Sequence, residues 1–201
     1  MAAIAALVAL GAVALAYGID GASRGQAGGR AEQATLVRTL GGKDLRIPES
    51  WLRYAEQKVE GFARQVDLAL TLPLGAEGRP VEVGVTLLPG SRVRPSASLL
   101  DGVYLHQFAS DEPAGPAGLM GKVLTRADGT TGETVWFDPI SADPFVAKCA
   151  APVAAGVPSR CLRSVRLAPG LAAIYAFDAE VLENWRRFDP EMRETLSRIG
   201  I

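Results

Sequence analysis

The N-terminal segment, residues 1–19, contains no charged side chain, and the first charge of the chain belongs to Asp20. A helix needs about 20 apolar residues to cross the hydrocarbon core of a membrane, and this segment nearly reaches that length. A secretory signal instead has a shorter apolar region before a small-residue cleavage site, and Ala14-Leu15-Ala16 fits such a site. The segment predicts a retained membrane anchor or, alternatively, a signal cleaved near Ala16.

The charges beside this segment bear on orientation. Basic residues are expected on the cytoplasmic flank, yet Arg24, Arg30 and Arg38 all follow the segment. A start codon upstream of Met1 would supply basic residues before it, and long domains translocate largely regardless of charge. We expect a single-pass protein of the bacterial inner membrane with its C-terminal domain in the periplasm, or secretion to the periplasm after cleavage.

Two cysteines, Cys149 and Cys161, flank a loop of small residues, prolines and glycine. An even cysteine count behind an export-type N-terminus is typical of an oxidising compartment, so we predict a disulfide with Cα atoms about 4.4 to 6.8 Å apart. The alternative is two buried free thiols in a cytosolic protein. Two cysteines and one distant histidine do not make a tetrahedral metal site, and we expect no metal and no cofactor.

The remaining chain divides into a linker and one domain. Glycine-rich residues 20–35 predict a flexible tether, and residues 36–201 are long enough for a single domain with its own core. The net charge is −1 with no basic stripe, which argues against nucleic acid as a partner.

Period-two alternation and turn residues predict a sheet. Gly41-Gly42 predicts a hairpin turn, and Asp128-Gly129 predicts another between two later strands. The segment 171–177 is apolar on both faces, which is typical of a central strand covered on both sides. The predicted strands are 65–72, 81–88, 99–108, 119–125, 133–137, 145–149, 161–167 and 171–177.

Helices are predicted at two places. Pro48 suits a first helical turn, and apolar residues follow it at helical spacing as far as Phe62. Near the C-terminus, Asp178 is a candidate N-cap, and Asp189-Pro190 resembles a second helix start. Met192, Leu196 and Ile199 form one apolar stripe. Together these elements predict an α+β domain, mainly an antiparallel sheet with C-terminal helices.

No constellation in the sequence specifies a reaction. The chain has neither a nucleophile elbow nor a phosphate-binding loop, and His106 is its single histidine. Asp138, Asp143 and Asp189 each precede a proline, which is ordinary turn chemistry. We therefore predict no catalytic residues; the alternative is a small envelope hydrolase that uses two such carboxylates.

Candidate interface residues are Trp136, Tyr104 and His106. Alternation places Trp136 on the strand face opposite Val135 and Phe137, so either a helix or a partner must cover it. Trp51-Leu52-Arg53-Tyr54 and Trp185-Arg186-Arg187-Phe188 are aromatic–basic clusters in which helical spacing already explains the pattern.

The order of motifs from Ile47-Pro48 to Trp185 resembles an uncharacterised group of single-span bacterial envelope proteins. The chain matches it in Trp51-Leu52-Arg53-Tyr54, the two cysteines, Tyr175-x-Phe177 and Leu182-x-x-Trp185. The resemblance implies the compartment and no catalytic residue. We expect a non-catalytic, membrane-tethered periplasmic protein that binds a protein of the envelope or inner membrane; an immunity-type inhibitor of a toxin is the narrower alternative.

Overall fold

The computed structural model describes residues 34–125, 131–152, 154, 156–167 and 169–201. Its strands are β1 (Thr35–Leu40), β2 (Lys43–Pro48), β3 (Gly61–Ala63), β4 (Val66–Leu72), β5 (Val81–Pro89), β6 (Met120–Thr125), β7 (Thr131–Phe137), β8 (Val146–Ala150), β9 (Arg160–Arg166) and β10 (Leu171–Asp178). Its helices are α2 (Ser96–Gly102) and α3 (Trp185–Ser197), and the short 3-10 turns are η1 (Glu49–Trp51), η2 (Ala55–Gln57), η3 (Ala76–Gly78), η4 (Gly90–Arg92), η5 (Tyr104–Gln107) and η6 (Ala179–Asn184).

The predicted anchor over residues 1–19 and the predicted tether as far as residue 33 lie outside the described residues. Within the described part of the chain, no helix is long and apolar enough to span a membrane.

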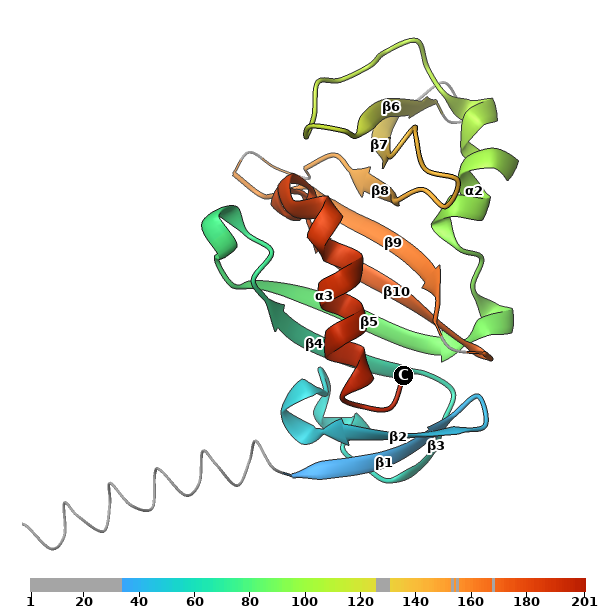
Figure 1. Cartoon of the computed structure of the whole chain (residues 1–201), viewed down its shortest axis with the longest axis vertical. Helices are drawn as coiled ribbons and strands as arrows, with labels where there is room; N and C mark the ends of the chain where they lie inside the picture. Colours follow the sequence, from blue (N-terminus) through green and yellow to red (C-terminus); the bar gives the residue numbers. More distant parts are fainter. Residues whose placement is uncertain (1–33, 126–130, 153, 155, 168) are drawn as a thin grey trace, which may run out of the picture.

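The strands form two sheets, and α3 lies across one face of the larger one (Figure 1). The small sheet has the order β2-β1-β3 and the large sheet the order β4-β5-β10-β9-β8-β7-β6. Each strand pair of the large sheet is antiparallel. The small sheet and β6–β8 lie at opposite ends of the molecule (Figure 1). The predicted α+β class with a mainly antiparallel sheet is confirmed.

The first hairpin forms where the glycine pair predicts it. Gly41 and Gly42 have φ values of 61° and 83°, and Leu40 pairs with Lys43 across the turn. Positive φ at both central residues is the requirement of the type I′ turn, whose twist matches that of the flanking strands. The predicted β6–β7 hairpin is also confirmed, although residues 126–130 of its turn lie outside the described residues.

β10 is an internal strand of the large sheet, between β5 and β9, as predicted. Leu171, Ala173, Tyr175 and Phe177 face α3 and are at most 2% exposed. On the opposite face only Ala172 is buried, whereas Ile174 and its neighbour Ala176 are partly exposed. The prediction that both faces are fully covered is therefore wrong for the second half of the strand.

The main core lies between the large sheet and α3. The predicted helical stripe is confirmed, since Met192, Leu196 and Ile199 are each 1% exposed. Phe188 joins them and contacts Phe177, with ring centroids 4.8 Å apart. Close aromatic pairs of this kind add about 0.5 to 1.5 kcal/mol beyond the area that they bury.

The predicted helix over residues 48–62 is wrong. Pro48 ends β2, and the chain continues as η1 and η2 before β3. Tertiary hydrogen bonds impose this course, because the amide of Arg53 donates to the carbonyl of Asp67 at 2.9 Å. The buried carboxylate of Asp67 also accepts a bond from the Gln57 side chain at 2.8 Å. Phe62, expected on the apolar stripe, is 90% exposed.

The predicted strand over residues 99–108 is also wrong, because this segment forms α2 and η5. These turns cover the other face of the large sheet over β6, β7 and β8. Their Leu100 packs with the strand residues Leu124, Val135, Phe137 and Val146 in a second apolar cluster, joined by partly buried Tyr104 and Phe108. Period-two spacing does not separate a buried strand from short helical turns in so brief an apolar run.

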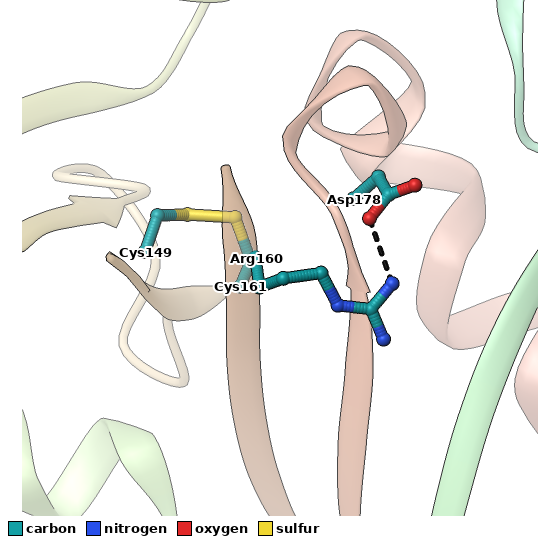
Figure 2. The surroundings of a disulfide bond; sticks show 4 residues. All are labelled: Cys149, Arg160, Cys161 and Asp178. Carbon is teal, nitrogen blue, oxygen red and sulfur yellow. Dashed lines mark hydrogen bonds and ion pairs between the residues drawn. A yellow bond between two sulfur atoms is a disulfide. The ribbon is translucent and has the colours of Figure 1, made fainter. Parts of the chain in front are cut away.

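At the C-terminus, Asp189-Pro190 does not begin a second helix. α3 runs from Trp185 through Pro190 without interruption, and Asp189 pairs with Arg163 of β9, as described below. Asp178 does precede η6, yet its side chain makes no capping bond. It pairs instead with Arg160, at 2.7 Å (Figure 2).

The disulfide between Cys149 and Cys161 is present and joins β8 to β9 (Figure 2). The two cysteines are directly opposite in register, and Lys148 pairs with Leu162 beside them. Their Cα atoms lie 3.9 Å apart, below the predicted interval of about 4.4 to 6.8 Å. The disulfide therefore reinforces a short ladder that links the two parts of the large sheet.

Candidate functional site

Trp136, a predicted interface residue, is covered by a loop. The ring packs against the main core, and the glycine- and proline-rich segment 110–118 lies over it. A Cβ atom added at Gly115 would lie 2.0 Å from the ring, and one added at Gly121 would lie 2.5 Å away. The loop covers part of this side chain, which is partly exposed and also lines a second cavity of about 520 Å³.

Substituting Gly121 with alanine is expected to destabilise the protein by about 1 to 3 kcal/mol, the usual cost of overpacking a well-packed site. Gly121 is buried in β6, and the ring it would displace is held on its other side by the core. The control is Gly132→Ala in β7, where the added Cβ meets nothing within 4 Å. Denaturant unfolding of both variants measures the difference, and equal free energies of unfolding would contradict the prediction.

Tyr104 and His106 lie on η5, away from Trp136. Tyr104 belongs to the second apolar cluster, whereas Trp136 packs on the opposite face of the sheet with the main core. Burial raises the pKa of the Tyr104 hydroxyl, and the nearby charge of Glu133 adds to this shift. His106 is exposed. The three residues do not form one surface, and their role in an interface stays a prediction.

The three aspartates that precede a proline have two kinds of surroundings. Asp138 accepts a hydrogen bond from the amide of Ile140 at 3.1 Å, and the amide of Asp143 donates to the Ser141 hydroxyl at 3.2 Å. Both are turn interactions of the predicted type. Asp189 is different, because its carboxylate faces the sheet and takes part in the site described next.

A cavity of about 520 Å³ lies between α3, β9, β10 and the segment that leads into α2. We call it the α3–β9 cavity and define it by its polar lining residues Arg163, Tyr175, Asp189, Arg193, Arg166 and Asp143. Its volume falls in the range of about 300 to 1,000 Å³ that is usual for ligand sites. The cavity is therefore a candidate binding site, and it differs from the second cavity of the same volume, beside Trp136, because three arginines line it.

Arg163 and Asp189 form the rigid wall of the cavity. The guanidinium donates to both carboxylate oxygens, from Nε at 3.1 Å and from Nη2 at 2.6 Å. Its Nη1 donates to the carbonyl of Val146 at 3.2 Å, and the group lies 4.4 Å from the centroid of the Phe145 ring. A two-bond pair of this geometry is stronger and more directional than a single ion contact. One side chain thus ties β9 to β8, to the loop before β8 and to α3.

Tyr175 is a buried residue at the same place. The residue is 2% exposed and lines the cavity, and its ring contacts Phe188 at 5.4 Å between centroids. Among the described residues its hydroxyl has no hydrogen-bond partner. Burial raises its pKa far above the ordinary value, and Asp189 adds to this shift, whereas Arg163 and Arg193 oppose it. The phenol therefore stays protonated and can donate a hydrogen bond throughout the physiological pH range.

The raised pKa of Tyr175 predicts a loss of stability at alkaline pH. The unfolded chain releases this proton near the ordinary pKa of 10.0, while the folded protein keeps it. The contribution is therefore complete below about pH 10 and is lost above it, with a slope of at most about 1.4 kcal/mol per pH unit. In Tyr175→Phe the free energy of unfolding should no longer fall with pH through this group. In Tyr54→Phe, which changes a half-exposed site, the fall should remain. Denaturant unfolding at about pH 9 and pH 11 measures both; equal slopes in the two variants would contradict the assignment.

Two positive charges that line the cavity are not balanced by an ion pair among the described residues. Arg193 and Arg166 line it and have no ion-pair partner among the described residues. The charge of Asp189 is already balanced by Arg163, which leaves exposed Asp143 as the opposing group. The arrangement can bind and orient an anionic acceptor. No cluster of three or more histidine, cysteine or acidic side chains that could hold a metal ion occurs among the described residues.

The sequence analysis did not identify Arg163, Tyr175 or Arg193 as site residues. One signal was available for Arg163, because alternation from the buried Cys161 places it on the inward face of its strand. A charged residue at an inward position needs a partner, and the strand contains none.

Comparison with known proteins adds one structural likeness. No family model matches the chain, and no curated protein sequence matches it. Among solved structures, the chain is similar to Smlt3025, an immunity protein of the Stenotrophomonas maltophilia type IV secretion system. The two chains are 13% identical, with a TM-score of 0.47, over 83% of this chain and 93% of that one.

Proposed function

We propose that this chain is a non-catalytic, extracytoplasmic binding domain and that the α3–β9 cavity receives a group from a protein partner. The observation that carries the proposal is the cavity itself, in which the hydroxyl of a buried tyrosine and two free arginines line unfilled space. Ligand sites combine concave, partly apolar surface with a few convergent polar groups, and the α3–β9 cavity has this composition.

The chemistry of the cavity supports binding in preference to catalysis. The Asp189 carboxylate, which would be the natural acid or base, is held in two bonds by Arg163. The Ser164 hydroxyl donates to the carbonyl of Arg94 at 2.8 Å, and neither histidine, lysine nor cysteine is among the residues lining the cavity. A reactive site needs a nucleophile beside a base, or an acid and a base with separated pKa values.

The disulfide supports the compartment. Disulfides persist in oxidising environments such as the periplasm and are rare in the cytosol. In this proposal residues 1–19 anchor the protein in the inner membrane, or are removed after export, and the domain faces the periplasm. Fractionation of cells, combined with thiol labelling of the denatured and unreduced protein, tests this. Recovery in the cytosol with two reactive thiols would overturn it.

Site-specific photo-cross-linking in living cells tests the binding role. A photoreactive residue at Ser98, which is exposed and lines the cavity, is expected to form an adduct with one partner protein. The matched control is the same residue at Phe62, which is 90% exposed on the small sheet and far from the cavity. Loss of the Ser98 adduct in Arg193→Glu would support the cavity as the contact site. The absence of any adduct at Ser98, or identical adducts at both positions, would overturn the proposal.

An immunity-type inhibitor of a toxin is the narrower form of the proposal. It is favoured by the rigidity of the cavity, whose polar groups project from β9, β10 and α3 and are fixed by the Arg163–Asp189 pair. An inhibitor gains affinity when its contact groups are already in place before binding. Deletion of the gene is then expected to sensitise cells to one specific toxin, and complementation with Arg193→Glu should fail to restore resistance. If no toxin distinguishes the deletion strain from its parent, the narrower form is wrong while the binding role can stand.

A further inference from the structure

Three features of the α3–β9 cavity together define the chemistry of its ligand. The first is the Tyr175 hydroxyl, which belongs to a residue that is 2% exposed and has no partner among the described residues. The residue lines the cavity, so its hydroxyl is free to pair with a group that enters there. A protonated phenol donates a hydrogen bond to an acceptor.

The second feature is the uncompensated charge. Arg193 on α3 and Arg166 on β9 carry no ion pair within the described residues. An acceptor that lies between these arginines and Tyr175 is most strongly held when it is an anion, because charge-assisted hydrogen bonds are roughly twice as strong as neutral ones.

The third feature limits the size of the negative charge. The exposed carboxylate of Asp143 also lines the cavity and offsets one of the two free arginines, which disfavours a doubly charged group. The cavity contacts α3 through Asp189, Arg193 and Leu196, in the middle and last turns of the helix, so the helix N-terminus that commonly binds phosphate is not directed at it. A singly charged carboxylate fits this pattern better than a phosphate.

The apolar part of the lining indicates what carries the carboxylate. Val165, Leu167 and Leu196 line the same space, which suits an aliphatic stem behind the charged group. We infer that the α3–β9 cavity binds the carboxylate of a glutamate side chain of the partner protein, with Tyr175 and Arg193 as its hydrogen-bond donors. This inference rests on the proposed binding function and names the group that the cavity recognises.

The test is an NMR titration of the oxidised full-length chain in detergent micelles. The probe is the acetylated, amidated peptide Gly-Ala-Glu-Ala-Gly, and the matched peptide carries glutamine in place of glutamate. The glutamate peptide is expected to shift amide signals of β9, β10 and α3 with a Kd of roughly 0.1 to 10 mM, as befits one anchoring group without the rest of an interface. The glutamine peptide should bind at least about tenfold more weakly, since one charge-assisted bond accounts for a factor of that size.

Variants assign the donors. Tyr175→Phe removes one oxygen and keeps the ring, and it should weaken glutamate binding at least about tenfold. Arg193→Gln should weaken binding and also flatten its dependence on salt. Arg187→Gln, which removes the same charge from another face of α3 and does not line the cavity, should leave the Kd within about twofold. Near-ultraviolet circular dichroism identifies any variant that has lost its fold. If Tyr175→Phe does not fold, the affinity of Arg193→Gln, which changes an exposed side chain, decides the result alone.

Further probes separate the sources of the anion. Free glutarate that binds as tightly as the peptide would assign the cavity to a small carboxylate and overturn the protein ligand. Inorganic phosphate that binds more tightly than either would overturn the carboxylate. Equal affinity of the glutamate and glutamine peptides, or full affinity in Tyr175→Phe, would also overturn the inference. A cross-link at Ser98 that persists in Tyr175→Phe and Arg193→Gln would show that the binding role holds and that only the recognition of a carboxylate fails.

Discussion

Replacing Asp189 with alanine is expected to lower the free energy of unfolding by about 3 kcal/mol, because the variant leaves a buried guanidinium without its counter-ion. The Arg163 side chain is only 8% exposed and loses both of its bonds to the carboxylate. The estimate takes the low end of the usual range of about 3 to 5 kcal/mol for a broken buried pair, since the Asp189 side chain is 38% exposed. Denaturant unfolding of the oxidised protein measures the loss.

The control is Asp143→Ala, which removes the same kind of side chain from an exposed position on the same cavity. It should change the free energy of unfolding by no more than about 0.5 kcal/mol. The double variant Arg163→Met with Asp189→Leu should recover most of the loss, because an apolar pair of similar volume removes the unpaired charge. If Asp189→Ala costs no more than Asp143→Ala, the pair does not fix α3 to the sheet as described.

Replacing Cys161 with serine is expected to cost a similar amount, about 3 kcal/mol within the usual range of 2 to 5 kcal/mol for a small secreted domain. The bond closes a loop with a sequence separation of 12 residues, and removing it returns conformational freedom to the unfolded chain. It also removes the covalent support of a ladder in which Cys149 and Cys161 form one of the residue pairs. Unfolding curves with and without reductant measure the effect.

Reduction provides the matched control for this prediction. Reduced wild-type protein should show the same loss as Cys161→Ser, and reductant should cause no further loss in the variant. A wild-type protein whose unfolding curve does not respond to reductant would contradict the prediction. Labelling of the denatured, unreduced wild type should detect no free thiol, because both cysteines of the chain are in the bond.

The strands could largely be predicted from the sequence, because their burial alternates and their turns have strong local signals. In β4, Val66, Leu68 and Leu70 are at most 3% exposed, as period two requires. The failures occur where tertiary contacts override a local pattern. Residues 48–62 have helical spacing, but hydrogen bonds to Asp67 from two places in the segment stop a helix from forming.

The candidate site was harder to predict than the fold, because its partners are distant in sequence. Asp189 follows Arg163 by 26 residues, and the pair forms only when α3 packs across β9. The local sequence at Asp189-Pro190 favours a turn, and no periodicity in the sequence indicates that a helix continues through it. Tyr175 presents the same difficulty, because a tyrosine in a central strand is ordinary, and only the space beside its hydroxyl makes it unusual.

The two ends of the described chain lie at the same end of the molecule, and this arrangement limits where the protein can be extended without harm. β1 begins at Thr35 in the small sheet, and the amide of Arg46 in β2 donates to the carbonyl of Ile199 at 3.3 Å. Ile201 itself lines the α3–β9 cavity. A fluorescent protein or affinity tag fused after Ile201 would therefore lie beside the cavity and obstruct a ligand that enters it. β6 and β7 lie at the opposite end of the molecule from the small sheet (Figure 1), so a fusion joined to these strands would be placed away from Ile201.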